Sequence, residues 1–223
     1  LGVTGVLTAT SLDISGDIDV DGTTNLDAVD VDGAVNFAAD VTFTDGADII
    51  TASAGTSNFR AGVNAGNSIT SGGNYNVVVG DEAGTAITTG DNNVAVGYAA
   101  LDANQTANHN VAIGASALGS NTTGATNTAV GGESMTANTE GGNNVALGYQ
   151  SLHDLTTGSN NVAIGYQALS TEDAHGDNVA VGYQSLKTLN AGADAFNTAV
   201  GYQSGVSVTT GIQNTLIGGL AGD

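Results

Sequence analysis

The carboxylates and histidines are the residues of this sequence that could bind a metal ion. An Asp-x-Asp-Gly phrase occurs at Asp19–Gly22 and again at Asp30–Gly33, and a calcium-binding loop begins in this way. A complete loop requires later oxygen ligands, including a Glu at its twelfth position, and these ligands are missing. His109, His153 and His175 lie at spacings that do not suit one shared metal ion. We therefore interpret the Asp-Gly phrases as β-turns and expect no metal and no cofactor.

Catalytic side chains do not form a recognisable set. No nucleophile and base occur at a known spacing, and no Gly-x-Gly-x-x-Gly phrase opens a helix. Cleavage of a polysaccharide would require paired carboxylates in a groove. The acidic residues do not recur at a position that would build such a groove. The sequence therefore predicts no catalytic residues and a protein that is not an enzyme.

Tyrosine and glutamine side chains offer a different chemistry, because a ring can stack on a sugar while an amide donates and accepts hydrogen bonds. The tyrosines recur at regular spacing, and in four copies a glutamine follows directly. The candidate receptor-contact residues are Tyr98, Tyr149, Gln150, Tyr166, Gln167, Tyr183, Gln184, Tyr202 and Gln203. Packing of these tyrosines against one another, without any ligand, is the alternative interpretation.

The composition indicates thin stacked layers rather than a large globular core. The 223 residues include 34 Gly and no Pro, Cys or Trp, and a net charge of −20 results from 22 acidic and two basic residues. Nucleic acid and anionic membranes both require clusters of Lys or Arg, so neither is expected as a partner. The acidic residues are interpreted as a solvated surface, with cation binding or adaptation to salt as alternatives. No apolar run approaches the ~18 residues of a membrane span, so no membrane insertion is expected.

An internal repeat predicts the architecture. The motif Asn-[Val/Thr]-x-[Val/Ile/Leu]-Gly occurs nine times, at 17-residue steps with a single step of 19. Its copies begin at Asn76, Asn93, Asn110, Asn127, Asn144, Asn161, Asn178, Asn197 and Asn214, with a weaker copy at Asn58. A fixed period of this kind is typical of a solenoid whose coils bury a core only by stacking. We expect the Asn side chains to form a ladder along the axis.

Alternation along each motif predicts which residues share a face. We expect the fourth position, occupied by Val79, Val96, Ile113, Ile164 and their equivalents, to form the interior stack. The position three residues after the Gly is always Ala or Ser and is interpreted as sterically tight, and the Leu or Met that follows it in six copies should form a second interior row. The middle position would then point outward as a smooth apolar stripe suited to contact between identical chains. The predicted trimer interface is Ala95, Ala112, Ala129, Ala146, Ala163, Ala180 and Ala199.

Residues 1–55 follow another rhythm, with short apolar pairs alternating with Asp, Gly and Thr. We interpret them as an acidic β-fibre stem and residues 56–223 as β-solenoid head repeats. The predicted fold is all-β: a parallel β-solenoid or β-roll of about nine 17-residue coils, preceded by the stem and homotrimeric. Because the chain begins at Leu1 rather than Met, we expect it to be part of a longer polypeptide.

Two resemblances follow from these motifs. The phrase Asn-Val-Ala-Ile-Gly, followed by a small-residue strand, resembles the YadA-like head repeat of trimeric autotransporter adhesins over residues 76–222. That resemblance implies a left-handed parallel β-roll trimerised around its axis, although the family repeat is usually shorter than 17 residues and its membrane anchor does not occur here. Residues 12–26 resemble the shaft of tail fibres of marine tailed phages, which can also carry Asn-x-Ala-[Val/Ile]-Gly repeats.

The expected function is structural and adhesive. We expect a phage tail-fibre segment on the virion, extracellular, that holds or contributes to host receptor binding. Its expected partners are two further copies of itself and a cell-surface glycan or protein receptor. A bacterial trimeric surface adhesin is the alternative, and a depolymerase segment carried on a fibre is a third hypothesis.

Overall fold

The computed structural model describes residues 54–223, and the stem predicted for residues 1–55 therefore lies almost entirely outside the described part. Within residues 54–223 the regular structure is entirely β, in agreement with the predicted fold class. The strands are β1 (Phe59–Ala61), β2 (Val77–Val79), β3 (Val94–Val96), β4 (Val111–Ile113), β5 (Thr128–Val130), β6 (Val145–Leu147), β7 (Val162–Ile164), β8 (Val179–Val181), β9 (Thr198–Val200) and β10 (Thr215–Ile217).

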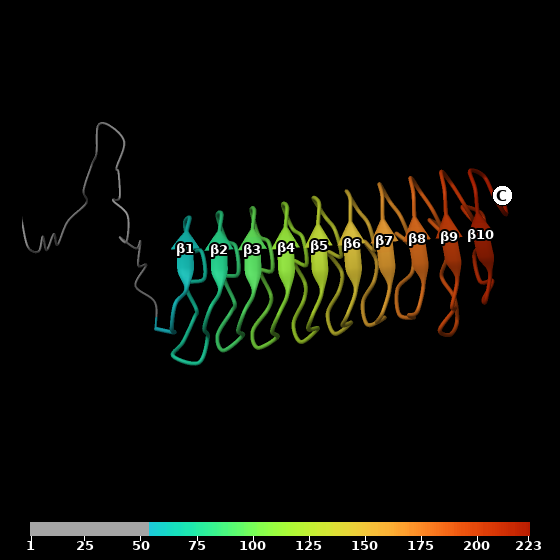
Figure 1. The fold of residues 1–223 in the computed structure, drawn as a ribbon. Coiled ribbons are helices and arrows are strands. Elements are labelled where there is room, and N and C mark those ends of the chain that lie inside the picture. Colours follow the sequence, from blue (N-terminus) through green and yellow to red (C-terminus); the bar gives the residue numbers. More distant parts are fainter. Residues whose placement is uncertain (1–53) are drawn as a thin grey trace, which may run out of the picture. The chain divides into compact units, whose positions relative to one another are not determined.

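The strands form one sheet in sequence order, and every neighbouring pair is parallel and in register (Figure 1). The predicted parallel stacking of the motif strands is confirmed, and the weaker copy at Asn58 supplies the first strand, β1. At the usual spacing of about 4.8 Å between strands, the sheet spans ~43 Å. Each coil contributes one short strand, and turns return the chain to the next coil.

An asparagine ladder connects each coil to the next, as predicted. The backbone N–H of Asn93 donates to Oδ1 of Asn76 at 2.9 Å, and the same bond repeats from Asn76 to Asn214 at 2.8–3.2 Å. The Asn93 Nδ2 donates to the carbonyl of Ala107 at 2.9 Å, on the turn that closes the same coil. One side chain therefore satisfies backbone groups in two places, which explains why the motif begins with Asn.

Left-handed backbone conformations bend each coil at fixed positions. In the coil of β7 they occur at Asn160, Gln167 and Leu169, with φ of 62°, 53° and 51°, and the other coils repeat this pattern. Asn, Asp and Gly adopt this conformation more readily than other residues, but they occupy only nine of these thirty positions. Bulky residues such as Leu169 adopt it at some energetic cost, which the packing of the neighbouring coils must offset.

The glycine at the end of each motif is required for its backbone conformation, and in the nine coils before that of β10 it is also required for lack of space. Its φ lies between 126° and 142° in all ten coils, a region that only Gly adopts readily. A Cβ on Gly165 would also lie 2.4 Å from the carbonyl oxygen of Gly182 in the next coil. The motif glycines therefore allow the coils to approach closely as well as to bend.

The middle residue of each strand points into the coil, which reverses one prediction. The alanines of this inner row are fully buried within a single chain, so the predicted trimer interface is wrong for Ala95, Ala112, Ala129, Ala146, Ala163, Ala180 and Ala199. The predicted interior row of Val79, Val96, Ile113, Ile164 and their equivalents points outward instead. Ile113 is 39% exposed and Leu147 is 45% exposed. Alternation showed that the first and third residues of each strand share a face, but it could not show which face was inside.

The interior has room for only a fixed volume, which explains the small inner row. The inner alanines share the core with fully buried Leu101, Leu118, Met135, Leu152, Leu169 and Leu186, a row that was predicted correctly. Where the inner residue is larger, the residue in the Leu position is Gly. A Cβ on Gly84 would lie 3.1 Å from Val78, and a Cβ on Gly222 would lie 2.8 Å from Leu216. Large residues on one side of the coil are therefore matched by glycine on the other.

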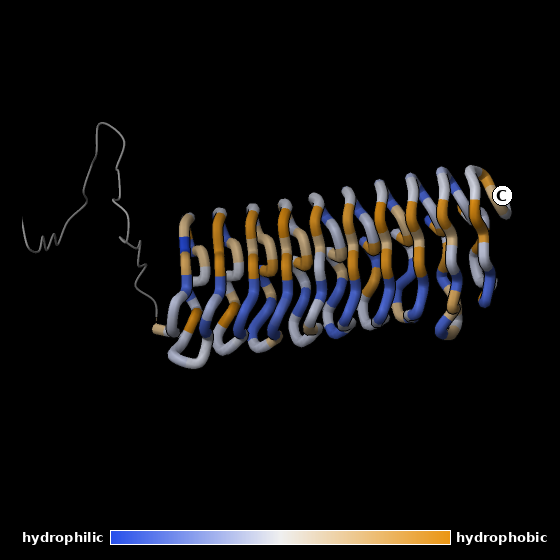
Figure 2. The backbone as a smooth tube through the Cα atoms, in the orientation of Figure 1, coloured by the Kyte–Doolittle hydropathy of each residue, from blue (hydrophilic) through white to orange (hydrophobic). Residues whose placement is uncertain are grey.

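Two apolar rows remain on the outside of the sheet, and we call them the outer rows. They are the first and third residues of the strands, and Figure 2 shows the apolar character of the strands continuing from coil to coil. From β2 to β10 every residue of these rows is Val, Ile, Leu or Thr. An apolar stripe along the sheet therefore exists, but on the opposite face from the one predicted.

Three glycine substitutions separate the two requirements on the motif glycine. Gly165→Ala introduces both strain at φ 133° and a close contact with Gly182, and we expect a loss of about 3 kcal/mol or more. Gly218→Ala introduces strain at φ 126° but meets nothing within 4 Å, so a loss of about 1–3 kcal/mol is expected. Gly192→Ala has neither problem and should change stability by less than about 0.5 kcal/mol. Urea unfolding followed by circular dichroism measures all three, and equal losses would contradict this account.

Candidate functional site

Four tyrosines form a continuous stack along the coils. Ring centroids lie 5.8 Å apart between Tyr149 and Tyr166, and 5.3 Å apart in the next two pairs, which extend the stack to Tyr183 and Tyr202. The ring planes are 8–21° from parallel. Each Tyr directly follows a motif glycine, so the in-register coils place the rings one above the other. The structure thus brings together four of the five predicted tyrosines.

Tyr98 lies outside this stack, because two coils separate it from Tyr149. Those coils carry Ala115 and Gly132 at the tyrosine position. Tyr98 is 60% exposed, against 42–44% for Tyr149, Tyr166 and Tyr183. The sequence predicted an aromatic surface that included Tyr98, whereas in the structure the stacked rings extend only from Tyr149 to Tyr202.

The glutamines form a second ladder beside the tyrosines. Nε2 of Gln167 donates to Oε1 of Gln150 at 2.9 Å, and Gln184 and Gln203 continue the chain with bonds of 3.0 Å. All four glutamines have left-handed backbone conformations, with φ of 51–54°. Each amide therefore has at least one partner within the protein, and the ladder has a defined direction along the axis.

Glu133 terminates the glutamine ladder at one end. Its Oε2 accepts a hydrogen bond from Nε2 of Gln150 at 2.7 Å and another from the hydroxyl of Tyr149 at 3.1 Å. These two bonds, the one from Gln150 foremost, lower the pKa of the Glu133 carboxyl. The hydrogen bond to Glu133 also raises the pKa of the Tyr149 phenol. Sequence reasoning missed Glu133, although its position in the repeat is the one that Gln150 occupies in the next coil.

The stack limits how a ligand could contact these tyrosines. Rings whose centroids lie 5.3–5.8 Å apart pack face to face. A sugar ring therefore cannot lie flat on a tyrosine within the stack. The edges of the rings and the exposed part of the glutamine ladder remain available to solvent. A ring face without a tyrosine neighbour occurs at Tyr98 and at the two ends of the stack, on Tyr149 and on Tyr202, which is 56% exposed. The rings therefore pack between coils, and recognition along the middle of the stack must use ring edges and hydroxyl groups.

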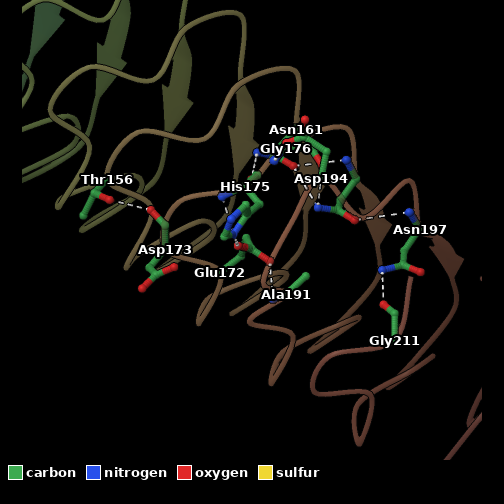
Figure 3. Close-up of polar contacts among 11 residues, drawn as sticks. Thr156, Asn161, Glu172, Asp173, His175, Gly176, Ala191, Asp194, Asn197 and Gly211 are labelled. Atoms are coloured by element: carbon green, nitrogen blue, oxygen red, sulfur yellow. Dashed lines mark hydrogen bonds and ion pairs between the residues drawn. The ribbon is translucent and has the colours of Figure 1, made fainter. Parts of the chain in front are cut away.

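An acidic cluster in one turn was not predicted from the sequence. The ligand atoms of Glu172, Asp173 and His175 lie within 4.8 Å of one another (Figure 3). Glu172 is fully buried, and its two oxygens accept hydrogen bonds from the backbone N–H groups of His175 and Ala191, each at 3.1 Å. The Nδ1 of His175 lies 3.4 Å from Glu172 Oε1.

These contacts give Glu172 a structural role. Ala191 lies in the lengthened turn, residues 190–196, that contains the two-residue insertion, and Asp194 in the same turn accepts a hydrogen bond from the Gly176 N–H at 3.1 Å. The position of Glu172 is occupied by Asn104, Asn121 and Asn138 in earlier coils, where the side chain also satisfies turn backbone groups. The longer Glu reaches across to the insertion, which Asn could not do.

Comparisons with protein-family models, with characterised proteins and with solved structures find no match to this chain. Among the described residues no helix is long and apolar enough to cross a lipid bilayer.

The pKa of Glu133 tests the end of the glutamine ladder. In Gln150→Ala the stronger donor is lost, and we expect the carboxyl pKa to rise toward its ordinary value; Tyr149→Phe should give a smaller rise. Since folding lowers this pKa, the stabilising contribution of Glu133 is present above its unfolded pKa and is lost as pH falls through the folded value. Carboxyl titration by NMR measures the shift. Ala is tolerated at this position, as Ala99 shows, and an unchanged pKa in Gln150→Ala would contradict the assignment.

Proposed function

We propose that residues 56–223 form a structural, adhesive segment of a homotrimeric tail fibre of a tailed phage, with no catalytic activity of its own. The fibre would lie on the virion surface and hold or contribute to host receptor binding. The observation that carries this proposal is the pair of apolar outer rows along the whole sheet. The phage assignment additionally rests on the resemblance of residues 12–26 to fibre shafts.

The outer rows differ from the rest of this acidic chain because they carry no charged residue. A net charge of −20 keeps the protein soluble, yet neither outer row carries a charged residue in any of the ten strands. Apolar patches that extend over many elements usually mark contact surfaces. Burying them would also separate the acidic turns of different chains, because the turns lie at the ends of the strands rather than over them.

Identical copies are the partners that best fit these rows. Each row repeats once per coil, so an identical chain aligned in parallel presents its own rows at the same interval. Val, Ile and Leu side chains from facing sheets can then interdigitate along the whole length. A three-fold arrangement would direct the three sheets toward one axis, as the resemblance to YadA-like heads implies. The glycine bends, turns and tyrosine stack would then remain accessible for other contacts.

Receptor contact is assigned to the tyrosine and glutamine ladders and to the variable turns. The turns at 102–109, 136–143 and 170–177 differ in sequence although their coils repeat, and variable loops on a rigid scaffold commonly carry binding residues. A strongly acidic chain disfavours acidic glycans, so the expected ligand is a neutral glycan. The alternative of a bacterial surface adhesin is distinguished by genomic context, since virion genes would surround a fibre gene and a membrane-anchor domain would accompany an adhesin.

Substitutions on the two faces of β7 test the assembly. Ile164→Asp lies on an outer row and should reduce the trimer to a monomer with its β-structure intact, because three carboxylates would be buried near the axis. Ala163→Glu lies on the inner row and should unfold the coils, since an unpaired charge in a dry core costs several kcal/mol. Light scattering gives the mass, and circular dichroism gives the fold.

Thr157→Asp is the matched control, because it adds the same charge on an exposed turn and should change neither the mass nor the fold. A wild-type chain that remains monomeric at micromolar concentration contradicts the proposed assembly. So does a trimer that tolerates Ile164→Asp.

The tyrosine stack is tested with two kinds of substitution. Replacing Tyr166 and Tyr183 by Phe keeps the stacked rings but removes the hydroxyl groups, so binding to an array of neutral glycans should fall at least fivefold while thermal stability is unchanged. Replacing the same residues by Ala should lower both binding and stability. If the wild-type trimer binds no glycan, or if both variants bind as the wild type does, this stretch is a spacer and recognition is carried elsewhere in the fibre.

A further inference from the structure

One oxygen atom of the protein shows what the tyrosine and glutamine ladders are able to hold. Oε2 of Glu133 accepts hydrogen bonds from the hydroxyl of Tyr149 at 3.1 Å and from Nε2 of Gln150 at 2.7 Å. The hydroxyl and the amide of one coil therefore converge on a single acceptor atom. Because the coils stack in register, the next coil presents the same pair of groups at Tyr166 and Gln167. Each later coil can thus hold an oxygen atom in the same way.

In three later coils the protein leaves these groups available. Within residues 54–223 the hydroxyls of Tyr166, Tyr183 and Tyr202 form no hydrogen bond, and these side chains are 42–56% exposed. Each glutamine beside them uses one of its two amide hydrogens in the ladder, which leaves the second for another acceptor. We call these groups the hydroxyl strip, and its residues are Tyr166, Gln167, Tyr183, Gln184, Tyr202 and Gln203.

Both ends of the hydroxyl strip are set by residues of the repeat. At one end the Tyr149 hydroxyl is already bound to Glu133. At the other end the coil of β10 carries Gly219 and Leu220 in place of tyrosine and glutamine. The strip therefore extends over the three coils of β7, β8 and β9, with ring centroids 5.3 Å apart from one coil to the next.

Charge and spacing select the class of ligand. A chain of net charge −20 disfavours anionic polymers such as nucleic acids and acidic glycans. In an extended peptide the side chains on one face recur at about 6.7 Å, so they would fall out of step with rings 5.3 Å apart. A pyranose ring is about as long as one coil step. An extended glycan therefore places one monosaccharide unit, with its own ring and hydroxyl oxygens, at each coil.

We propose that the hydroxyl strip binds a linear neutral glycan that lies along the solenoid axis, with one monosaccharide unit at each of the three coils. An oxygen atom of each unit accepts a hydrogen bond from the tyrosine hydroxyl, from the second amide hydrogen of the glutamine, or from both. This inference rests on the receptor role proposed above for the two ladders, and it adds the linear form, the orientation and the length of the bound glycan. It requires no particular assembly, because the strip lies within a single chain.

Titration calorimetry with the full chain tests the number of bound units. The probes are neutral linear oligosaccharides of one to five units, built from glucose, galactose, mannose or N-acetylglucosamine. For the sugar that binds, affinity should rise about fivefold with each unit up to three and then level off, since each coil adds about one hydrogen bond. A branched isomer of the trisaccharide should bind no more tightly than the disaccharide.

Substitutions at the two ends of the strip should change the limiting length. Tyr202→Phe keeps the stacked ring and removes one hydroxyl, so affinity should level off at two units. Glu133→Ala frees the Tyr149 hydroxyl and should extend the rise to four units, and alanine already occupies this position at Ala99. Tyr75→Phe is the matched control, because it makes the same change at an exposed tyrosine outside the ladders and should leave the limit at three.

The outcomes separate this inference from the proposed function. Affinity that does not depend on chain length, or a limit that stays at three units in both Tyr202→Phe and Glu133→Ala, contradicts the inference but leaves glycan binding in place. No binding of any of these oligosaccharides contradicts both the inference and the receptor role. Light scattering of the same samples reports the proposed trimer separately in every case.

Discussion

The in-register stacking of each coil on the next is the constraint from which the rest of this structure follows. The asparagine ladder requires that every Asn lie directly above its predecessor, with contacts of 2.8–3.2 Å at each step. The same close spacing requires glycine at the end of the motif. A Cβ there would lie only 2.2–2.8 Å from the carbonyl group of the following coil. Any change that moved one coil sideways would break both rows at once. The repeat therefore tolerates variation in its turns but little in its motif.

Stacking also dictates a thin interior. A coil of 17 residues with a strand of three encloses little volume, and its core is completed by neighbours above and below. This explains why alanine faces leucine in most coils and why glycine faces the larger Val78 and Leu216. It also explains the buried polar ladder. Turn backbone groups inside such a coil have no water to bond to, and Asn104, Asn121, Asn138 and Glu172 supply the missing partners.

Exact repetition converts single side chains into continuous surfaces. A Tyr after one motif glycine becomes a stack of four rings, and a Gln beside it becomes a chain of amides. A Val at one strand position becomes an apolar row as long as the sheet. These surfaces differ in chemistry and lie at different positions of the coil. One protein can therefore assemble through one surface and present another, which is the physical basis of the proposed fibre segment.

The sequence by itself determined the period, the parallel all-β solenoid, the asparagine ladder and the buried Leu row, because each depends on local residue types repeated at a fixed interval. Only the tertiary structure decided which face of the strand is inside. In Val162-Ala163-Ile164 all three residues are apolar, so alternation groups Val162 with Ile164 but leaves the inner face open. The inner face is decided by the opposite side of the coil, because Leu169 fills most of the interior and leaves room only for Ala. The contact of Glu172 with Ala191 likewise joins residues of different coils across an irregular insertion, and no periodic pattern could predict it.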